Sequence, residues 1–202
     1  MDSKGRILLI SGPSGSGKST LIHRLLKEEK GIYFSISCTT RPKRKGEKNG
    51  VHYHFISEDE FKKGIEEGEF LEWALVHDNY YGTSLKQVIK AFDDNKIVIF
   101  DIDVQGFKTA KEIFADEITS VFITTKSSEE LSKRLDERNT NTLDDIARRL
   151  ENASNEIQHL RSYDYLILND DLEKAYKELR AIFNALKCRT KYLNLKEFIA
   201  NW

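Results

Sequence analysis

Residues 11–20 read SGPSGSGKST and contain the pattern G-x-x-x-x-G-K-[ST]. Glycines in this pattern let backbone N–H groups turn inward and approach an anion closely. The lysine would reach the β- and γ-phosphates of a nucleoside triphosphate, and the hydroxyl after it would ligate Mg²⁺. The pattern therefore predicts a phosphate-binding loop made of Gly12, Pro13, Ser14, Gly15, Ser16, Gly17, Lys18, Ser19 and Thr20, with Ser19 also at the metal.

Two carboxylates follow an apolar run in the stretch VIFDID, at Asp101 and Asp103. An acid at the end of such a strand typically faces the metal in proteins with this loop. We therefore expect Asp101 to act on the metal through its water shell. Either residue could instead cap a strand end or a turn.

A basic cluster lies in residues 37–55, which read SCTTRPKRKGEKNGVHYHF. Five cations fall within eight residues, opposed only by Glu47: Arg41, Lys43, Arg44, Lys45 and Lys48. The stretch is too short and too rich in proline and glycine to form a helix with i,i+4 ion pairs. Guanidinium groups hold phosphate in bidentate fashion, so an arginine pair favours a second phosphorylated ligand. Taken alone, such a loop is more often simply solvated.

Composition limits the classes of protein. A chain of 202 residues fits one domain. The formal net charge of −1 argues against a general nucleic-acid binder. No apolar run approaches the roughly 20 residues of a membrane helix, and the N-terminus lacks the features of a signal peptide. Cys38 and Cys188 lie far apart in the sequence and match no metal-ligand spacing. We therefore expect a cytoplasmic protein in which both cysteines are reduced and form no disulfide.

The elements that must position these residues alternate along the chain. Continuous apolar runs predict strands at 6–10, 96–101, 118–125 and 165–168. Helical patterns lie between them, at 17–28, 85–93, 106–114, 128–137, 143–159 and 172–186. This alternation indicates an α/β fold with a parallel sheet covered on both faces. Two segments depart from it: residues 36–84, with a helix near 59–67, and the densely charged residues 126–150.

From residue 5 to about residue 186 the chain resembles guanylate kinases. The motifs that carry the resemblance are GPSGSGKST at 12–20, SCTTRPKRKGEKNGVHYHF at 37–55, EFLEWALVHDNYYGTS at 69–84, FDIDVQG at 100–106 and LNDDLEKA at 168–175. The first is generic to phosphate-binding loops, whereas the second and third together are highly specific. The resemblance implies a P-loop NTPase-like parallel sheet flanked by helices, in one domain over 1–202. Its parts would be a core (1–35, 85–125 and 151–202), a GMP-binding region (36–84) and a lid (126–150).

The resemblance implies Mg²⁺-dependent transfer of the γ-phosphoryl of ATP to GMP, and to dGMP, by direct in-line attack. It places the GMP phosphate at Arg41, Arg44, Tyr53 and Tyr81, and the guanine among Ser37, Glu72, Thr83 and Asp103. Guanine presents two donors on one edge, which a carboxylate accepts together. Adenine would set a lone pair against Glu72, and such mismatches discriminate by orders of magnitude. Without the resemblance, Glu72 would be read as a surface acid.

Residues 126–150 resemble the lid over the ATP phosphates, with Arg134, Arg138 and Arg149 at its basic positions. With Lys18 and Asp101 these would be the catalytic residues, since cations stabilise the transferred phosphoryl group and a lid excludes water. Spacing does not decide between Arg148 and Arg149, and a charged helix face with i,i+4 pairs is the alternative. Asn169 matches a family position near the adenine of ATP. The lid segment 137–140 reads ERNT where the family commonly has glycine before the arginine, so its flexibility is expected to differ.

Several expectations concern the rest of the chain. Phe70 and Trp73 are expected in the core rather than at a ligand, and Cys38 is expected to pack as an inert small residue. The pattern of residues 187–202 predicts a short amphipathic helix that docks either on the core or on another subunit. A homo-oligomer is therefore one of the two alternatives.

Two other functions deserve comparison. Scaffold proteins carry non-catalytic modules that resemble guanylate kinase, but the intact Lys18, Ser19 and lid arginines speak against that reading. A P-loop kinase for another acceptor, such as a bisphosphorylated sugar, is disfavoured by Glu72 together with Thr83.

Overall fold

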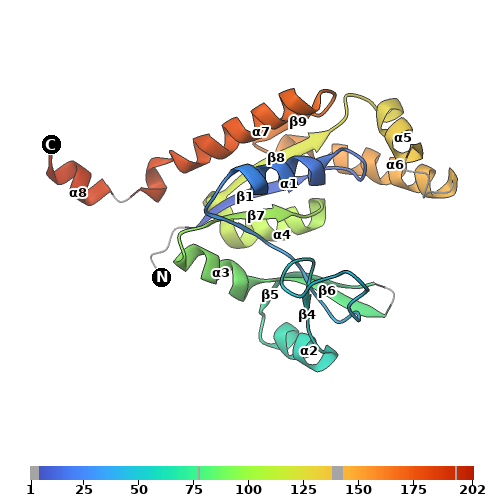
Figure 1. Ribbon diagram of the computed structural model, residues 1–202, viewed down its shortest axis with the longest axis horizontal. Helices are drawn as coiled ribbons and strands as arrows, with labels where there is room; N and C mark the ends of the chain where they lie inside the picture. Colours follow the sequence, from blue (N-terminus) through green and yellow to red (C-terminus); the bar gives the residue numbers. More distant parts are fainter. Residues whose placement is uncertain (1–4, 77, 138–142, 194) are drawn as a thin grey trace.

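The computed structural model describes residues 5–76, 78–137, 143–193 and 195–202, and its centre is a five-stranded sheet (Figure 1). The strands run in the order β2 (Ile32–Phe34), β7 (Ile97–Asp101), β1 (Arg6–Ser11), β8 (Ile118–Thr124) and β9 (Tyr165–Leu168). Each of their pairings is parallel, which confirms the predicted sheet. The short strand β2 was not predicted, because its apolar run of three residues is shorter than a typical strand signal.

Helices cover both faces of this sheet (Figure 1). On one face lie α1 (Lys18–Glu28) and α7 (Leu172–Lys187), and on the other lie α3 (Leu85–Asp93) and α4 (Val104–Phe114). Alternate residues of β1 point to opposite faces of the sheet. Leu8 and Ile10 pack in the cluster under α1 and α7, and Ile7 and Leu9 pack in the cluster under α3 and α4. This double burial explains why the central strands have continuous apolar sequences.

A second sheet lies below α3 and α4 in Figure 1. Its strands run in the order β4 (His54–Phe55), β3 (Cys38–Thr39), β6 (Asn79–Ser84) and β5 (Phe70–Val76). Helix α2 (Glu58–Glu66) begins with a capping box between Ser57 and Glu60. It packs on this sheet through Phe61, whose ring is stacked on that of Phe70 at 4.2 Å.

The expectation that Trp73 lies in the core is wrong. Its side chain is 48% exposed, and its ring lies 6.0 Å from that of Tyr80. Trp73 pairs with Gly82 across the hairpin, on an edge strand whose α2 side is only partly covered. Phe70 is half-buried.

Two further helices, α5 (Ser128–Asp136) and α6 (Leu143–Ile157), form a layer at the right of Figure 1. They share a small core of Leu131, Leu135, Ile146 and Ala153. Short 3₁₀ turns occur at Ala115–Glu117, Leu160–Ser162 and Thr190–Tyr192. No helix in the described ranges is long and apolar enough to cross a membrane.

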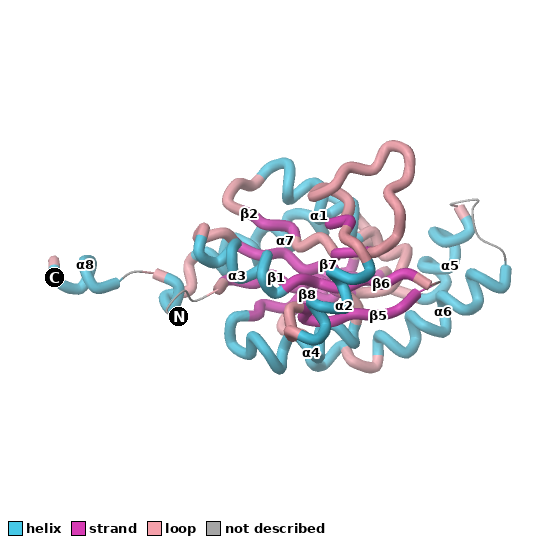
Figure 2. The backbone as a smooth tube through the Cα atoms, turned by 90° about the horizontal axis from the view of Figure 1, so that it is seen from below, coloured by secondary structure: helices cyan, strands magenta, loops and turns pink. Residues whose placement is uncertain are grey.

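The predicted helix of the tail is α8 (Leu195–Ala200). In both Figure 1 and Figure 2 it lies apart from the rest of the molecule, so it does not dock on the core of its own chain. Phe198, Ile199 and Trp202 are 60%, 65% and 93% exposed.

Candidate active site

The phosphate-binding loop connects β1 to α1. Gly12, Gly15 and Gly17 have φ values of 137°, 92° and 88°, which side-chain-bearing residues rarely adopt. A Cβ at Gly12 would lie 2.0 Å from the backbone oxygen of Ile123. The loop and the first turn of α1 enclose a cavity of about 250 Å³, lined by Pro13, Ser14, Gly15, Gly17, Lys18, Ser19 and Thr20. The start of a helix beside such a loop is suited to bind an anion.

Two polar side chains of this loop are available to phosphate oxygens. Lys18 Nζ folds back over the loop and donates to the backbone oxygens of Gly12 (2.5 Å) and Pro13 (3.3 Å). Ser16 Oγ is shielded from solvent and has no hydrogen-bond partner among the described residues. A buried hydroxyl of this kind can donate to an anion.

The two carboxylates after β7 have different surroundings. Asp101 pairs with Ile10 of β1, just before the loop. Burial raises the pKa of Asp101, while the charges of Lys18 and His23 lower it. Asp103 caps α4, because its Oδ1 accepts a hydrogen bond of 2.8 Å from the Gly106 N–H. The alternative reading as a cap therefore holds for Asp103, and its Oδ2 remains for other contacts.

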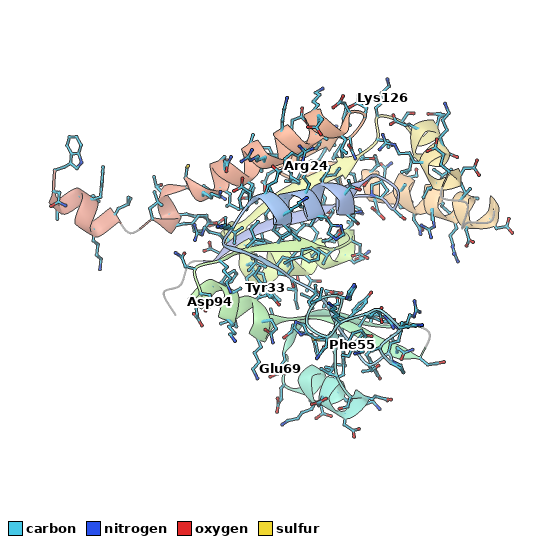
Figure 3. All side chains as sticks on the ribbon, in the orientation of Figure 1. Arg24, Tyr33, Phe55, Glu69, Asp94 and Lys126 are labelled. Atoms are coloured by element: carbon cyan, nitrogen blue, oxygen red, sulfur yellow. The ribbon has the colours of Figure 1, made fainter. Side chains whose placement is uncertain are left out.

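Four residues of the basic segment gather on one face of the second sheet. Arg41 makes a double contact with Glu47, at 2.7 Å and 3.0 Å. Its guanidinium carbon lies 5.4 Å from the ring centre of Tyr53, whose ring lies 5.9 Å from that of Tyr81. Phe55, labelled in Figure 3, completes this aromatic group, 5.6 Å from the same guanidinium.

Glu47 is a site residue that the sequence interpretation missed. Its hydrogen bond with the Arg41 side chain, and then that with the Arg44 backbone N–H, lower the pKa of Glu47 to about 2. Arg44 itself is exposed at the rim of this group. The available signal was its position as the one acid within a run of five cations.

The predicted guanine residues Glu72 and Thr83 face each other across β5 and β6. Thr83 Oγ1 donates to Glu72 Oε1 at 2.6 Å, and Thr83 is buried. Tyr81 lies two residues before Thr83 and so shares its face of the strand. Ser37 lies just before β3, where its backbone oxygen accepts from the His54 N–H at 2.9 Å.

The lid arginines separate into distinct positions. Arg149 Nη1 donates to Ser14 Oγ in the phosphate-binding loop at 2.7 Å. Arg148 points elsewhere and pairs with Asp145 at 2.8 Å, with 71% of its side chain exposed. Arg149 is therefore the member of this pair that faces the loop.

Arg134 contacts the core rather than the loop. It pairs with Glu130 one turn earlier and donates to the backbone oxygen of Asn169 at 2.6 Å. The pair with Glu130 is the i,i+4 contact of the alternative reading. Arg138 lies outside the described residues.

Asn169 is 4% exposed and connects two parts of the site. Its Nδ2 donates to the backbone oxygen of Ser16 at 2.7 Å, while its own backbone oxygen receives Arg134. The Asn169 side chain therefore stabilises the backbone of the phosphate-binding loop at Ser16. The following helix α7 is capped by Asp171, which accepts from the Lys174 N–H at 2.8 Å.

Cys38 packs as expected. It is 6% exposed, and burial raises the pKa of its thiol to about 11. Both cysteines are free thiols. Within the described ranges, no three or more His, Cys, Asp and Glu residues form a group that could hold a metal ion.

Comparison with known proteins identifies relatives over the whole chain. The family model "Guanylate kinase" matches residues 4–186. The guanylate kinase of Campylobacter jejuni subsp. jejuni serotype O:2 is 59% identical over 203 residues, covering 100% of this chain and 98% of that protein. That of Sulfurimonas denitrificans is 52% identical over 198 residues, covering 98% and 96%. The crystal structure of guanylate kinase from Anaplasma phagocytophilum superposes with a TM-score of 0.73 at 33% identity, covering 98% of this chain and 94% of that one.

Proposed function

The chain belongs to the guanylate kinase family of ATP:GMP phosphotransferases, and from this premise we propose how its residues perform the reaction. The substrates are ATP and GMP, with dGMP as a second acceptor, and the transfer is direct and in line. The observation that carries the proposal is the Glu72–Thr83 pair, which lies on the same sheet face as Tyr81. That face offers a guanine-selective carboxylate beside a group suited to phosphate.

The phosphate of GMP is proposed to bind Arg41, Arg44, Tyr53 and Tyr81. Guanidinium and phenol groups supply hydrogen-bond donors, and a phosphate supplies only acceptors. Glu47 holds the plane of the Arg41 guanidinium in place before the ligand arrives. Arg44, being exposed, can turn onto the phosphate from the rim.

The guanine is proposed to lie against Glu72, with Ser37, Thr83 and Asp103 around it. Glu72 Oε1 already accepts from Thr83, which fixes the orientation of the carboxylate. Its remaining lone pairs can accept from N1–H and the 2-amino group of guanine. Asp103 is held by its cap contact with Gly106 and keeps one oxygen for the base.

ATP is proposed to bind through residues 12–20, with Asn169 supporting the loop through Ser16. Ser19 lines the loop cavity, and Asp101, at the end of β7, lies within electrostatic reach of Lys18. These oxygen donors suit Mg²⁺, which prefers oxygen ligands and usually keeps several waters. Ser19 would ligate the ion directly, and Asp101 would hold it through water. When bound, Mg²⁺ would neutralise charge on the β- and γ-phosphates.

Transfer needs no nucleophile from the protein, because an oxygen of the GMP phosphate attacks the γ-phosphorus and ADP departs. Lys18 and Arg149 would stabilise the transferred phosphoryl group. The contacts of Lys18 with Gly12 and of Arg149 with Ser14, both in the phosphate-binding loop, support this role. Arg134 and Arg138 would join them when the lid, residues 126–150, closes over the core. Closure would also exclude water and so prevent hydrolysis of ATP.

This proposal divides the chain into a core (1–35, 85–125 and 151–202), a GMP-binding region (36–84) and the lid. It places the enzyme in the cytoplasm, with nucleotides rather than nucleic acids or membranes as partners. The apolar side chains of α8 favour contact with another subunit over contact with their own core.

The test is ADP release from ATP and Mg²⁺ with GMP, dGMP, AMP, CMP or UMP as acceptor, beside a reaction without acceptor. The proposal expects turnover with GMP and dGMP alone. Turnover that ignores the acceptor would identify an ATPase. Binding of GMP without any turnover would favour a non-catalytic module.

A further inference from the structure

A cavity of about 240 Å³ lies beside Asp103, between the first turn of α4 and the end of α6. Its polar lining consists of Asp103, Gln105, Asn152, Asn155, Glu156 and His159. None of the described residues that line it is a lysine or an arginine. Carboxylates, amides and an imidazole without such cations suit neutral hydroxyl groups better than a phosphate.

Glu156 is the residue in this lining that needs an explanation. Its Oε2 is shielded from solvent and has no hydrogen-bond partner in the described part of the chain. An acceptor left in that condition is costly, and functional sites are where proteins retain such groups. Glu156 is half-buried and lines the cavity, so its carboxylate can meet a ligand there.

The Glu156 carboxylate interacts electrostatically with residues of both the proposed ATP site and the proposed GMP site. Burial raises the pKa of Glu156, the charge of Lys18 lowers it, and the charge of Asp103 raises it further. Lys18 belongs to the loop for the transferred phosphoryl group, and Asp103 to the proposed guanine site. The Glu156 carboxylate therefore lies within electrostatic reach of both.

The helix phase agrees with this position. Arg149 and Glu156 are seven residues apart on α6, close to two full turns, so they share one face. Arg149 reaches Ser14 of the phosphate-binding loop from that face. Glu156 therefore lies on the side of α6 that faces the phosphate-binding loop and the cavity beside Asp103.

Tyr163 supplies a second polar group without a partner. Its hydroxyl is shielded from solvent and makes no well-formed hydrogen bond within the described residues, although Ser11 lies close enough to lower its pKa. Its ring is stacked on Phe107 at 4.2 Å and meets Phe122 edge-on at 5.2 Å, so its position is fixed. Burial raises the pKa of Tyr163 to about 12, and the charge of Glu156 acts in the same direction. The phenol therefore stays protonated at neutral pH, within electrostatic reach of the Glu156 carboxylate.

We propose that Glu156 receives the ribose hydroxyls of the acceptor nucleotide and that, in this bound state, the Tyr163 phenol donates to the Glu156 carboxylate. This rests on the proposed function, since it uses the same acceptor. Ribose joins the guanine, proposed beside Asp103, to the GMP phosphate, which must approach the γ-phosphoryl group near Lys18 for transfer. The Glu156 carboxylate lies within electrostatic reach of both Asp103 and Lys18. A vicinal diol offers two O–H donors, and a carboxylate is the acceptor that can take both. Glu156 thereby makes GMP a better substrate than dGMP.

The experiment compares kcat/KM for GMP, dGMP and 2′,3′-dideoxy-GMP in the wild type and in Glu156→Gln. We expect the substitution to lower kcat/KM about tenfold with GMP, and less than about twofold with the dideoxy analogue, which has no hydroxyl to lose. The KM for ATP should stay unchanged. Glu151→Gln is the matched control, because it makes the same change on the exposed side of the same helix.

Equal losses with all three acceptors would overturn the ribose contact while leaving the enzyme a GMP kinase. Tyr163→Phe gives an independent test if Glu156→Gln does not fold, because it removes one hydroxyl from an intact ring. It should reduce kcat/KM for GMP more than for the dideoxy analogue, whereas Tyr165→Phe, at a position that is 45% exposed, should change neither. A wild type without GMP-dependent ADP release would instead defeat the proposed function itself.

Discussion

Arg41 and Glu47 are joined at two points, Nη2 to Oε1 at 2.7 Å and Nη1 to Oε2 at 3.0 Å. Their side chains are 11% and 17% exposed, and the Arg44 N–H adds a third contact to Glu47 at 2.6 Å. The basic loop is therefore already folded around an internal anion. A guanidinium fixed in this way loses little further freedom when a phosphate binds.

Glu47→Gln should raise the KM for GMP about tenfold and leave the KM for ATP unchanged, since one charged fork of the Arg41 contact is lost. Initial rates at varied GMP and at varied ATP measure the two values. Glu66→Gln, on the exposed side of α2, is the control. A parallel rise in both KM values would show that Glu47 supports the whole fold instead of Arg41.

The same pair should make stability depend on pH. The folded-state pKa of Glu47 is lowered from the ordinary value of 4.5 to about 2, so its contribution is fully present above pH 4.5 and is lost as the pH falls toward 2. The difference in free energy of unfolding between the wild type and Glu47→Gln should therefore shrink on acidification below about pH 5. Denaturant titrations at several pH values measure it. A constant difference over this window would contradict an ionised pair.

Glu72→Gln should lower kcat/KM for GMP by about a hundredfold, because an amide offers guanine one acceptor and sets a donor against its two donors. ATP binding, followed by titration without acceptor, should change less than about twofold. Glu112→Gln, exposed on α4, serves as control. Comparable losses on both sides would remove Glu72 from the base site.

Arg149 and Arg148 offer a comparison between neighbours. Arg149→Lys should reduce kcat by about a hundredfold, because the donor that we propose for the transferred phosphoryl group would be shortened. Arg148→Lys should have almost no effect, since its pair with Asp145 is at the surface. Single-turnover measurements report the chemical step directly. If the two substitutions act alike, the contact of Arg149 with Ser14 is not the catalytic orientation.

The sequence allowed the parallel sheet and most of its helices to be predicted, because strands buried on both faces have unmistakable apolar runs. Strand β2 was missed because its apolar run is only three residues long, below the length at which such a run signals a strand. The choice between Arg148 and Arg149 required the phase of α6, which a spacing of one residue does not supply. Trp73 was misplaced because a large aromatic residue in a strand does not reveal whether anything covers it.

Local sequence patterns also do not reveal contacts between residues that lie far apart in the chain. Asn169 supports Ser16 across 153 positions, a contact that only the juxtaposition of β1, β8 and β9 creates. Glu156 and Tyr163 stood in a helix and a loop with no motif around them. In contrast, Glu72 and Thr83 were expected together because the family resemblance implied it, and the structure pairs them across the hairpin of β5 and β6.

The exposure of α8 has an optical consequence. The chain contains two tryptophans, Trp73 next to Glu72 and Trp202 beyond α8. Trp202 is 93% exposed, so iodide in solution should quench its fluorescence freely, whereas Trp73 is partly shielded by Tyr80. In Trp202→Phe all tryptophan emission would come from the strand that carries Glu72. The protein thus carries an intrinsic fluorophore on the strand of the proposed acceptor site, and one substitution in the tail isolates its signal.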